Sequence, residues 1–290
     1  MAERTEESSA ACKKRKTFEV ARCSRPQVST AQRPRVSSLF QSERIVCPPS
    51  DEVVLKLGSA RVCMGIDVET NDYVDGKKPY CLGRFGHGCW CSHADLEFRL
   101  VQIGWATSGC AKNEIIHGHS ERLIQPDKCI ISEKATKKHC ITNERVASYG
   151  LPLPQVLEEF MVAAWSLHEA GGVIVSHHLE FDSGIIDEEL RRCGMEKWRA
   201  RWQAVASRGI CTLDLDTQEW FQRAFGRIRS RGEKTLVLNL KDSVLLFYRT
   251  QPRIHELLKK AHTAGADAEL HILLFQALRG LADRDSQPLT

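Results

Sequence analysis

The sequence lacks the hallmarks of a membrane or secreted protein. No apolar run approaches the roughly 18–20 residues that a membrane span requires. The first ten residues are acidic and polar without an apolar stretch, which is unlike a secretory signal or a mitochondrial transit peptide. The 12 cysteines are therefore expected to be reduced thiols in an intracellular protein, nuclear or cytoplasmic, with no role for a membrane.

An excess of positive charge is also missing from most of the chain. The formal net charge of +4 combines 41 Lys and Arg with 37 Asp and Glu. Residues 1–50 hold 10 basic and 5 acidic residues, whereas the other 240 residues hold 31 and 32. This distribution disfavours a protein coated uniformly in positive charge, as many non-specific DNA binders are.

The N-terminal segment has few large apolar residues and no periodicity. It is rich in Ser, Thr, Arg and Gln, so residues 1–50 are expected to form a disordered basic tail. The basic run at residues 13–16 fits either a nuclear-localisation signal or a solvated tail. Residues 51–290 are expected to form the folded domain.

The folded part shows strands and helices in an informative order. Three strands are expected first, and then helices alternate with short strands, which indicates an α/β fold with a mixed sheet. The expected strands cover 60–68, 100–107, 113–124, 173–176 and 209–213, and the expected helices cover 154–170, 181–192, 235–248, 254–261 and 266–280.

Two carboxylates close the first expected strand. Asp67 and Glu69 are two residues apart, so their side chains project from the same side of the strand. They stand at its carboxyl end, where sites of α/β proteins usually lie. Adjacent carboxylates repel each other unless a cation lies between them, so the pair suggests a metal site. The alternative is a strand that ends in a polar turn.

Two further acids occupy comparable places. Asp182 follows the strand at 173–176 and lies in the first turn of the next helix, where it could either point back to the sheet or cap its own helix. Asp267 is expected to face inward from the last helix, with His262 in the loop before it. A chance pairing on a surface helix is the alternative for these two residues.

Taken together, these motifs resemble those of the DEDDh 3′–5′ exonucleases over roughly residues 60–282. Two departures are His178, where the family often has Asn, and Cys140, where it often has Gly. A third is a long insertion at residues 71–99. The matching residues are Asp67, Glu69 and Thr70 in the first motif, His177, Phe181 and Asp182 in the second, His262 and Asp267 in the third, His139, Ile141 and Thr142 between the first two, and Cys211 to Asp214 after the second.

The resemblance implies a ribonuclease H-like mixed five-stranded sheet flanked by helices. It also implies hydrolysis of DNA or RNA from the 3′ end, with release of nucleoside 5′-monophosphates. The partner would be nucleic acid with a free 3′ end, expected to be single-stranded. The implied roles are two Mg²⁺ or Mn²⁺ ions on Asp67, Glu69, Asp182 and Asp267, a general base at His262, and contacts to the terminal nucleotide from Val68, Thr70 and His139.

Other readings of the sequence stay open beside this one. A catalytically silent nucleic-acid-binding or adaptor protein is the alternative, although it should lack at least one of the five acidic and histidine residues, and none is missing. The insertion at 71–99 offers Cys and His ligands, but its Cys-x-Cys spacing is poor for structural zinc, which is not favoured. In residues 197–234, interleaved tryptophans and arginines suggest amphipathic helices with the tryptophans in the core, or a basic surface for a nucleic-acid strand.

Overall fold

The computed structural model describes residues 60–72, 98–111, 114, 116, 118–125, 127, 129–214 and 238–285. The predicted tail over 1–50 lies outside these residues. The insertion at 71–99 also lies outside them, except for residues 71, 72, 98 and 99. No helix among the described residues is long and apolar enough to cross a membrane.

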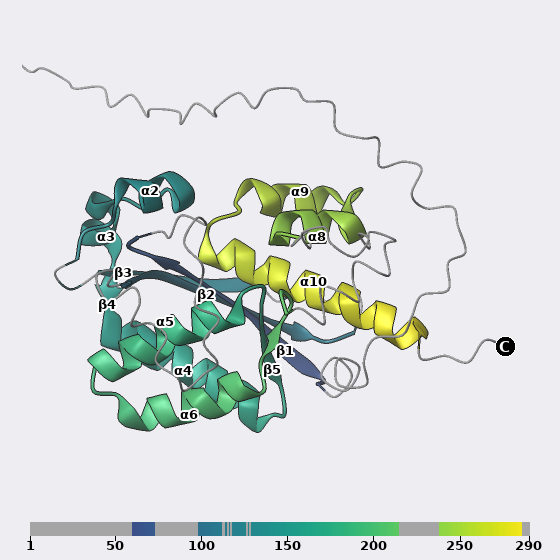
Figure 1. Cartoon of the computed structure of the whole chain (residues 1–290), viewed down its shortest axis with the longest axis horizontal. Helices are drawn as coiled ribbons and strands as arrows, with labels where there is room; N and C mark the ends of the chain where they lie inside the picture. Colours follow the sequence, from purple (N-terminus) through teal and green to yellow (C-terminus); the bar gives the residue numbers. More distant parts are fainter. Residues whose placement is uncertain are drawn as a thin grey trace, which may run out of the picture. The chain divides into compact units, whose positions relative to one another are not determined.

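A mixed sheet forms the centre of the fold (Figure 1). Its strand order is β4-β3-β2-β1-β5-β6. Strand β2 runs antiparallel to both β1 and β3, whereas β5 runs parallel to β1 and β6 parallel to β5. The strands are β1 (Val62–Thr70), β2 (Leu100–Gly109), β3 (His119–Gln125), β4 (Leu151–Pro152), β5 (Val173–Ser176) and β6 (Ile210–Cys211).

The predicted α/β class with a mixed sheet is confirmed, and the order β3-β2-β1-β5-β6 is the ribonuclease H-like arrangement. The sheet has six strands, not five, because the two-residue strand β4 pairs in parallel with the edge strand β3. Two residues show no periodicity, so the sequence did not reveal this strand. Strand β3 also begins at His119, later than the predicted start at residue 113.

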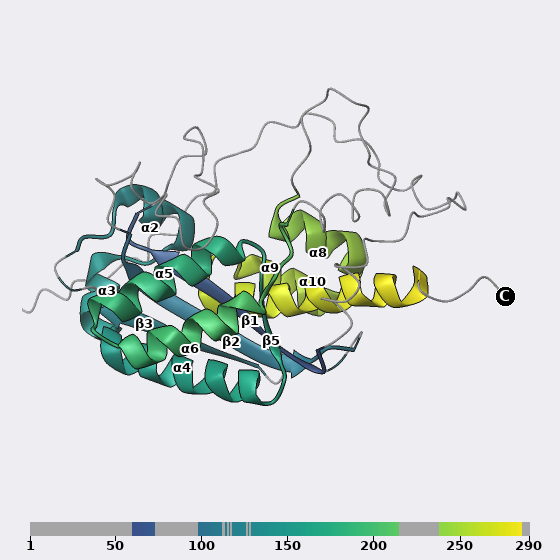
Figure 2. The same cartoon turned by 60° about the horizontal axis from the view of Figure 1, so that its bottom comes forward.

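Helices cover both faces of the sheet (Figures 1 and 2). Helices α4, α5 and α6 lie on one face, and α10 lies on the other with α8 and α9 packed against it. The helices are α2 (Glu133–His139), α3 (Asn143–Tyr149), α4 (Leu153–Glu169), α5 (Leu179–Arg192), α6 (Glu196–Ser207), α8 (Leu240–Tyr248), α9 (Pro252–Lys259) and α10 (Ala264–Asp285).

Each face of the sheet has its own hydrophobic core. On one side, Ile66 and Ile103 pack with residues of α4, α5 and α6, including the fully buried Trp202. On the other, Cys63 and Ala106 pack with residues of α8, α9 and α10. Strand β1 is therefore buried from both sides, which explains why its sequence is almost continuously apolar before Asp67. Trp202 is therefore a core residue, as one of the two interpretations expects, whereas Trp198 is half-buried and residues 215–234 lie outside the described ones.

The short helices α2 and α3 were not predicted. Each has seven residues, too few for a clear helical period, although each begins at a capping residue. Ser132 accepts a hydrogen bond from the Ala135 amide, and Thr142 accepts one from the Arg145 amide. Helix α2 ends at Cys140, whose φ of 59° is left-handed. That conformation favours glycine, so the side chain of Cys140 is an unusual choice at this helix end.

Helix α10 packs closely against the two central strands because glycines leave room for its backbone. A Cβ atom at Gly65 would overlap the carbonyl of Ala268, and one at Gly104 would overlap the backbone between Ala264 and Gly265. The first turn of α10 therefore lies directly on β2.

We predict that Gly104→Ala lowers the free energy of unfolding by about 1–3 kcal/mol, because the added methyl group must displace the backbone of α10. Urea denaturation measures the effect. Val162→Ala, at an exposed position of α4, is the control and should change the free energy by less than about 0.5 kcal/mol. Equal stability of the two variants would contradict the close contact.

Candidate active site

A cavity of about 230 Å³ gathers the predicted acidic residues from three elements. Asp67 and Glu69 come from β1, Asp182 from α5 and Asp267 from α10, and His262 lines the cavity from the loop before α10. The other lining residues are Val68, Thr70, Asp72, Phe98, Ala135, Lys138, His139, His177, His178, Phe181, Leu240 and His271.

Asp182 joins the ends of two neighbouring strands. Its Oδ1 accepts a hydrogen bond from the Val68 amide at 3.2 Å, and its Oδ2 accepts one from the Ser176 hydroxyl. The N-cap residue of α5 is His178, and no side chain caps this helix end. Asp182 therefore points back to the sheet as predicted, and the capping alternative is wrong.

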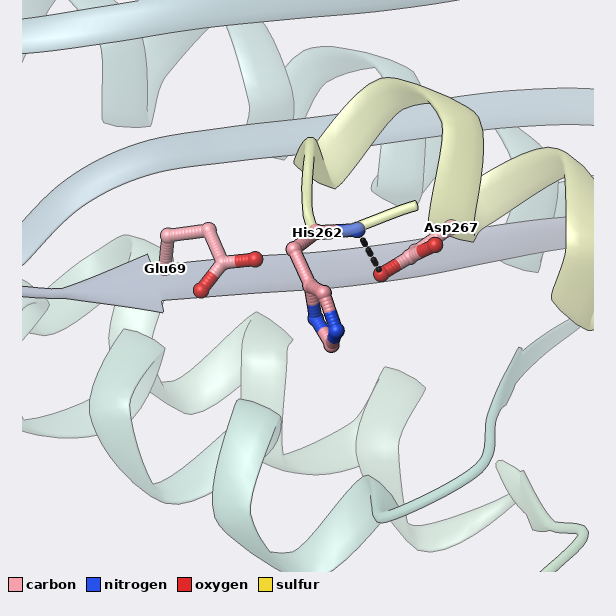
Figure 3. Close-up of side chains that lie close together, drawn as sticks. All are labelled: Glu69, His262 and Asp267. Carbon is pink, nitrogen blue, oxygen red and sulfur yellow. Dashed lines mark hydrogen bonds between the residues drawn. The ribbon is translucent and has the colours of Figure 1, made fainter. Parts of the chain in front are cut away.

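Asp267 and His262 are held together by a backbone contact (Figure 3). The His262 amide donates to Oδ2 of Asp267 at 3.0 Å, and His262 has a left-handed φ of 69°. Oδ1 of Asp267 is buried without a hydrogen-bond partner among the described residues. Such an oxygen is costly to bury unless a ligand or cation satisfies it.

Three of the predicted residues have atoms close enough to share one metal ion. Glu69, His262 and Asp267 each offer a ligand atom, and these atoms lie within 4.8 Å of one another. Figure 3 shows the Glu69 carboxylate beside the His262 side chain. Asp67 and Asp182 line the same cavity but are not members of this group.

Burial raises the pKa of all four carboxyl groups. The pKa of Asp67 lies well above its usual value, because burial is reinforced by repulsion from Asp267, Asp182 and Glu69. Burial raises the pKa of Glu69 to about 8, that of Asp182 to about 7 and that of Asp267 to about 6. A cation in the cavity would stabilise the charged forms of these groups.

His262 has the opposite shift. Partial burial lowers its pKa, and the cations Lys138 and Lys241 lower it further. The imidazole is therefore neutral near pH 7 and able to accept a proton. Its side chain is exposed, so solvent and a ligand can reach it.

The residues expected to contact a nucleotide already have partners within the protein. The Val68 amide donates to Asp182, as described above. His139 is buried, and its Nδ1 accepts from the Ile141 amide at 3.0 Å, so its Nε2–H donates to the Thr70 carbonyl at 3.1 Å. Burial lowers the pKa of His139. These contacts fix the end of β1 and the shape of the cavity wall.

Two buried histidines attach the cavity walls to one another. Nε2–H of His177 donates to the Leu238 carbonyl at 2.8 Å, and its Nδ1 lies 2.9 Å from the Thr212 hydroxyl. Nδ1–H of His271 donates to the Ile66 carbonyl at 2.8 Å. Burial lowers the pKa of these rings to about 4 and about 3, respectively, so both are neutral. His271 was not predicted, although it follows Asp267 by one helical turn, and that spacing is the one signal for it.

Two side chains of the sheet hold the first turn of α10, and the sequence analysis missed both. Oε1 of Gln102 accepts from the Ala264 amide at 2.9 Å, and Oε2 of Glu121 accepts from the Gly265 amide at 3.1 Å. Amides at a helix N-terminus have no partner within the helix, so these oxygens stabilise it. Gln102 lies opposite Glu69 in the antiparallel register, a relation that no local pattern indicates.

We predict that Gln102→Leu lowers the free energy of unfolding by about 1–3 kcal/mol, because the buried Ala264 amide loses its acceptor. Urea denaturation measures the loss. Gln203→Leu, on the surface of α6, removes a side-chain contact to Asp187 and should have a much smaller effect. If the two variants were equally stable, the contact of Gln102 would contribute nothing to the fold.

Known proteins resemble the chain only at a distance. No family model and no curated protein matches the sequence. Among solved structures, cell-death related nuclease 4 is 13% identical with a TM-score of 0.49, and the alignment covers 77% of this chain and 65% of that one. A full-length 3′-exonuclease is 13% identical with a TM-score of 0.46, with coverage of 78% and 62%.

A third structure is the nuclease domain of 3′hExo, described as a DEDDh family member bound to rAMP. It is 13% identical with a TM-score of 0.37, and the alignment covers 80% of this chain and 98% of that one. The chain thus spans slightly less than two thirds of the length of the first two structures. At this identity the structures do not indicate which reaction the chain catalyses, so its activity must be inferred from its own residues.

Proposed function

We propose that the chain is a metal-dependent 3′–5′ exonuclease that hydrolyses phosphodiester bonds of DNA or RNA and releases nucleoside 5′-monophosphates. The observation that carries the proposal is the convergence of four carboxylates and a neutral histidine on one cavity. Residues 51–290 would form the exonuclease domain, and residues 1–50 a basic tail. The order of these residues along the chain supports the proposal through the DEDDh resemblance.

The residues present fit a site for divalent metal ions. Oδ1 of Asp267 is buried without a hydrogen-bond partner among the described residues, and the carboxylates of Glu69 and Asp267 offer oxygens within 4.8 Å of each other. Carboxylate oxygens are hard ligands that suit Mg²⁺ or Mn²⁺. Asp67, Glu69, Asp182 and Asp267 would hold two such ions. When bound, these ions supply positive charge to the phosphate and lower the pKa of the attacking water.

His262 would be the general base of the reaction. Its lowered pKa keeps the ring neutral near pH 7, so it can take the proton of the attacking water. The hydrogen bond from its amide to Asp267 fixes its backbone beside the acidic group. Its exposed ring can return the proton to solvent after the reaction.

The terminal nucleotide would lie against Val68, Thr70 and His139, which line the same cavity. A single-stranded end is expected because the cavity of about 230 Å³ is small and would take the terminal nucleotide without its pairing partner. The proposed partner is therefore nucleic acid with a free, single-stranded 3′ end.

A catalytically silent nucleic-acid-binding or adaptor protein is the second candidate. Nothing favours it over the enzyme, because all four carboxylates and His262 are present and face one cavity. A zinc site in the insertion falls on residues outside the described ones.

We predict that 5′-labelled single-stranded DNA or RNA is shortened stepwise in the presence of Mg²⁺ or Mn²⁺, with release of nucleoside 5′-monophosphates. Gel electrophoresis shows the ladder, and chromatography identifies the product. A chelator should abolish the reaction, because it removes the ions that would supply positive charge to the phosphate and lower the pKa of the attacking water. Retarded but intact substrate would favour the silent binding protein.

We predict that His262→Ala lowers the single-turnover rate constant of hydrolysis by about 10²- to 10⁴-fold, the usual contribution of a general base. The measurement is single-turnover hydrolysis of a labelled oligonucleotide at saturating Mg²⁺. His255→Ala is the control, because this exposed histidine of α9 is not among the residues that line the cavity. Normal turnover by His262→Ala would rule out this base.

A further inference from the structure

Lys138 is the one lysine or arginine among the described residues that line the cavity. It lies near the end of α2, and Ala135 and His139 line the cavity from the same helix. These three residues are spaced three and four apart, so they share one face of α2. That face is a wall of the cavity distinct from the elements that carry the four carboxylates.

The position of this wall is fixed by contacts to the end of β1. The Ser132 amide donates to the Asn71 carbonyl at 2.8 Å, and the Ser132 hydroxyl donates to Asp72 at 2.8 Å. At the other end of α2, His139 donates to the Thr70 carbonyl. Helix α2 is thus attached at both ends to residues that directly follow Glu69. These contacts therefore fix the position of the Lys138 backbone relative to the carboxylates on β1.

The charge of Lys138 acts on both sides of the cavity. It opposes the rise in the pKa of Asp67, Glu69 and Asp267. It also lowers the pKa of His262. The ammonium group thus lies within electrostatic reach of three carboxylates that would hold metal and of the histidine that would be the base.

Lys138 lines the cavity, which distinguishes it from lysines that lie on the outer surface alone. Lys138 is exposed, and an exposed ion pair contributes little to stability. Its neighbour Lys137 illustrates such a pair, because it lies 3.6 Å from Glu133 on the outer surface and does not line the cavity. Phosphate binding would account for the position of Lys138, because lysine is a compact point charge that commonly binds phosphate oxygens.

Charge balance also favours a phosphate contact. Four carboxylates carry four negative charges, which two divalent cations would neutralise. A phosphodiester adds a further negative charge and gains more in the transition state, so a fixed cation beside it stabilises that state. We propose that Lys138 binds the phosphate group of the terminal nucleotide, an inference that rests on the proposed function.

The full chain is compared with Lys138→Met, Lys138→Arg and Lys137→Met. AMP binding in the presence of Mg²⁺ is measured by calorimetry, and Mn²⁺ binding is measured separately without nucleotide. We predict that Lys138→Met weakens AMP binding roughly 10- to 100-fold, the effect of losing one charge-assisted hydrogen bond. Lys138→Arg should retain most of the affinity, and Lys137→Met should equal the wild type.

Mn²⁺ binding separates phosphate binding from a structural role. We expect Lys138→Met to leave the Mn²⁺ affinity unchanged or to tighten it, because a cation is removed from the surroundings of the carboxylates. If AMP and Mn²⁺ affinity both fell, Lys138 would shape the site instead, and the inference would be overturned. Equal AMP affinity of Lys138→Met and wild type, or no AMP binding by the wild type, would overturn it as well.

Hydrolysis of labelled oligonucleotides by the same proteins tests the proposed function independently. Stepwise degradation by the wild type together with unchanged AMP binding by Lys138→Met would support the proposed nuclease activity and rule out phosphate binding by Lys138. The opposite result is no degradation by the wild type but weaker AMP binding by Lys138→Met. It would rule out the proposed nuclease activity and still support phosphate binding by Lys138.

Discussion

The repulsion among Asp67, Glu69, Asp182 and Asp267 is the constraint on which the rest of this structure depends. Four carboxyl groups meet in one cavity, and burial raises the pKa of each. Such an arrangement is unfavourable in an isolated protein and becomes favourable when cations share the space. Much of the surrounding structure holds these groups together despite the free-energy cost of burying them side by side.

The fold holds them by tying different elements to one another at the cavity. Asp182 bridges β1 and β5 through the Val68 amide and Ser176, and the His262 amide holds Asp267. The first turn of α10 is fixed by Gln102 and Glu121 from two other strands. None of these bonds forms within a single element. A change in the packing of α10 would therefore move Asp267 and His262 together.

Helix α2 supplies the complementary charge. Its attachment to the end of β1 places Lys138 at the same cavity, so Lys138 and the carboxylates influence one another's charge. The buried histidines His139, His177 and His271 contribute hydrogen bonds without charge, because burial lowers the pKa of each. Neutral rings add no further positive charge to the proposed site for metal and phosphate.

Sequence alone predicted the α/β class and the main strands, because hydrophobic periodicity is a local property of the chain. It also singled out Asp67, Glu69, Asp182, His262 and Asp267 through the order of motifs on which the DEDDh resemblance rests. It did not determine β4, α2 or α3, which are too short to show a period. Only the tertiary structure decided that Gln102 and Glu121 hold α10 and that Lys138 faces the acids. Those relations depend on strand register and helix docking, which bring together residues far apart in the chain.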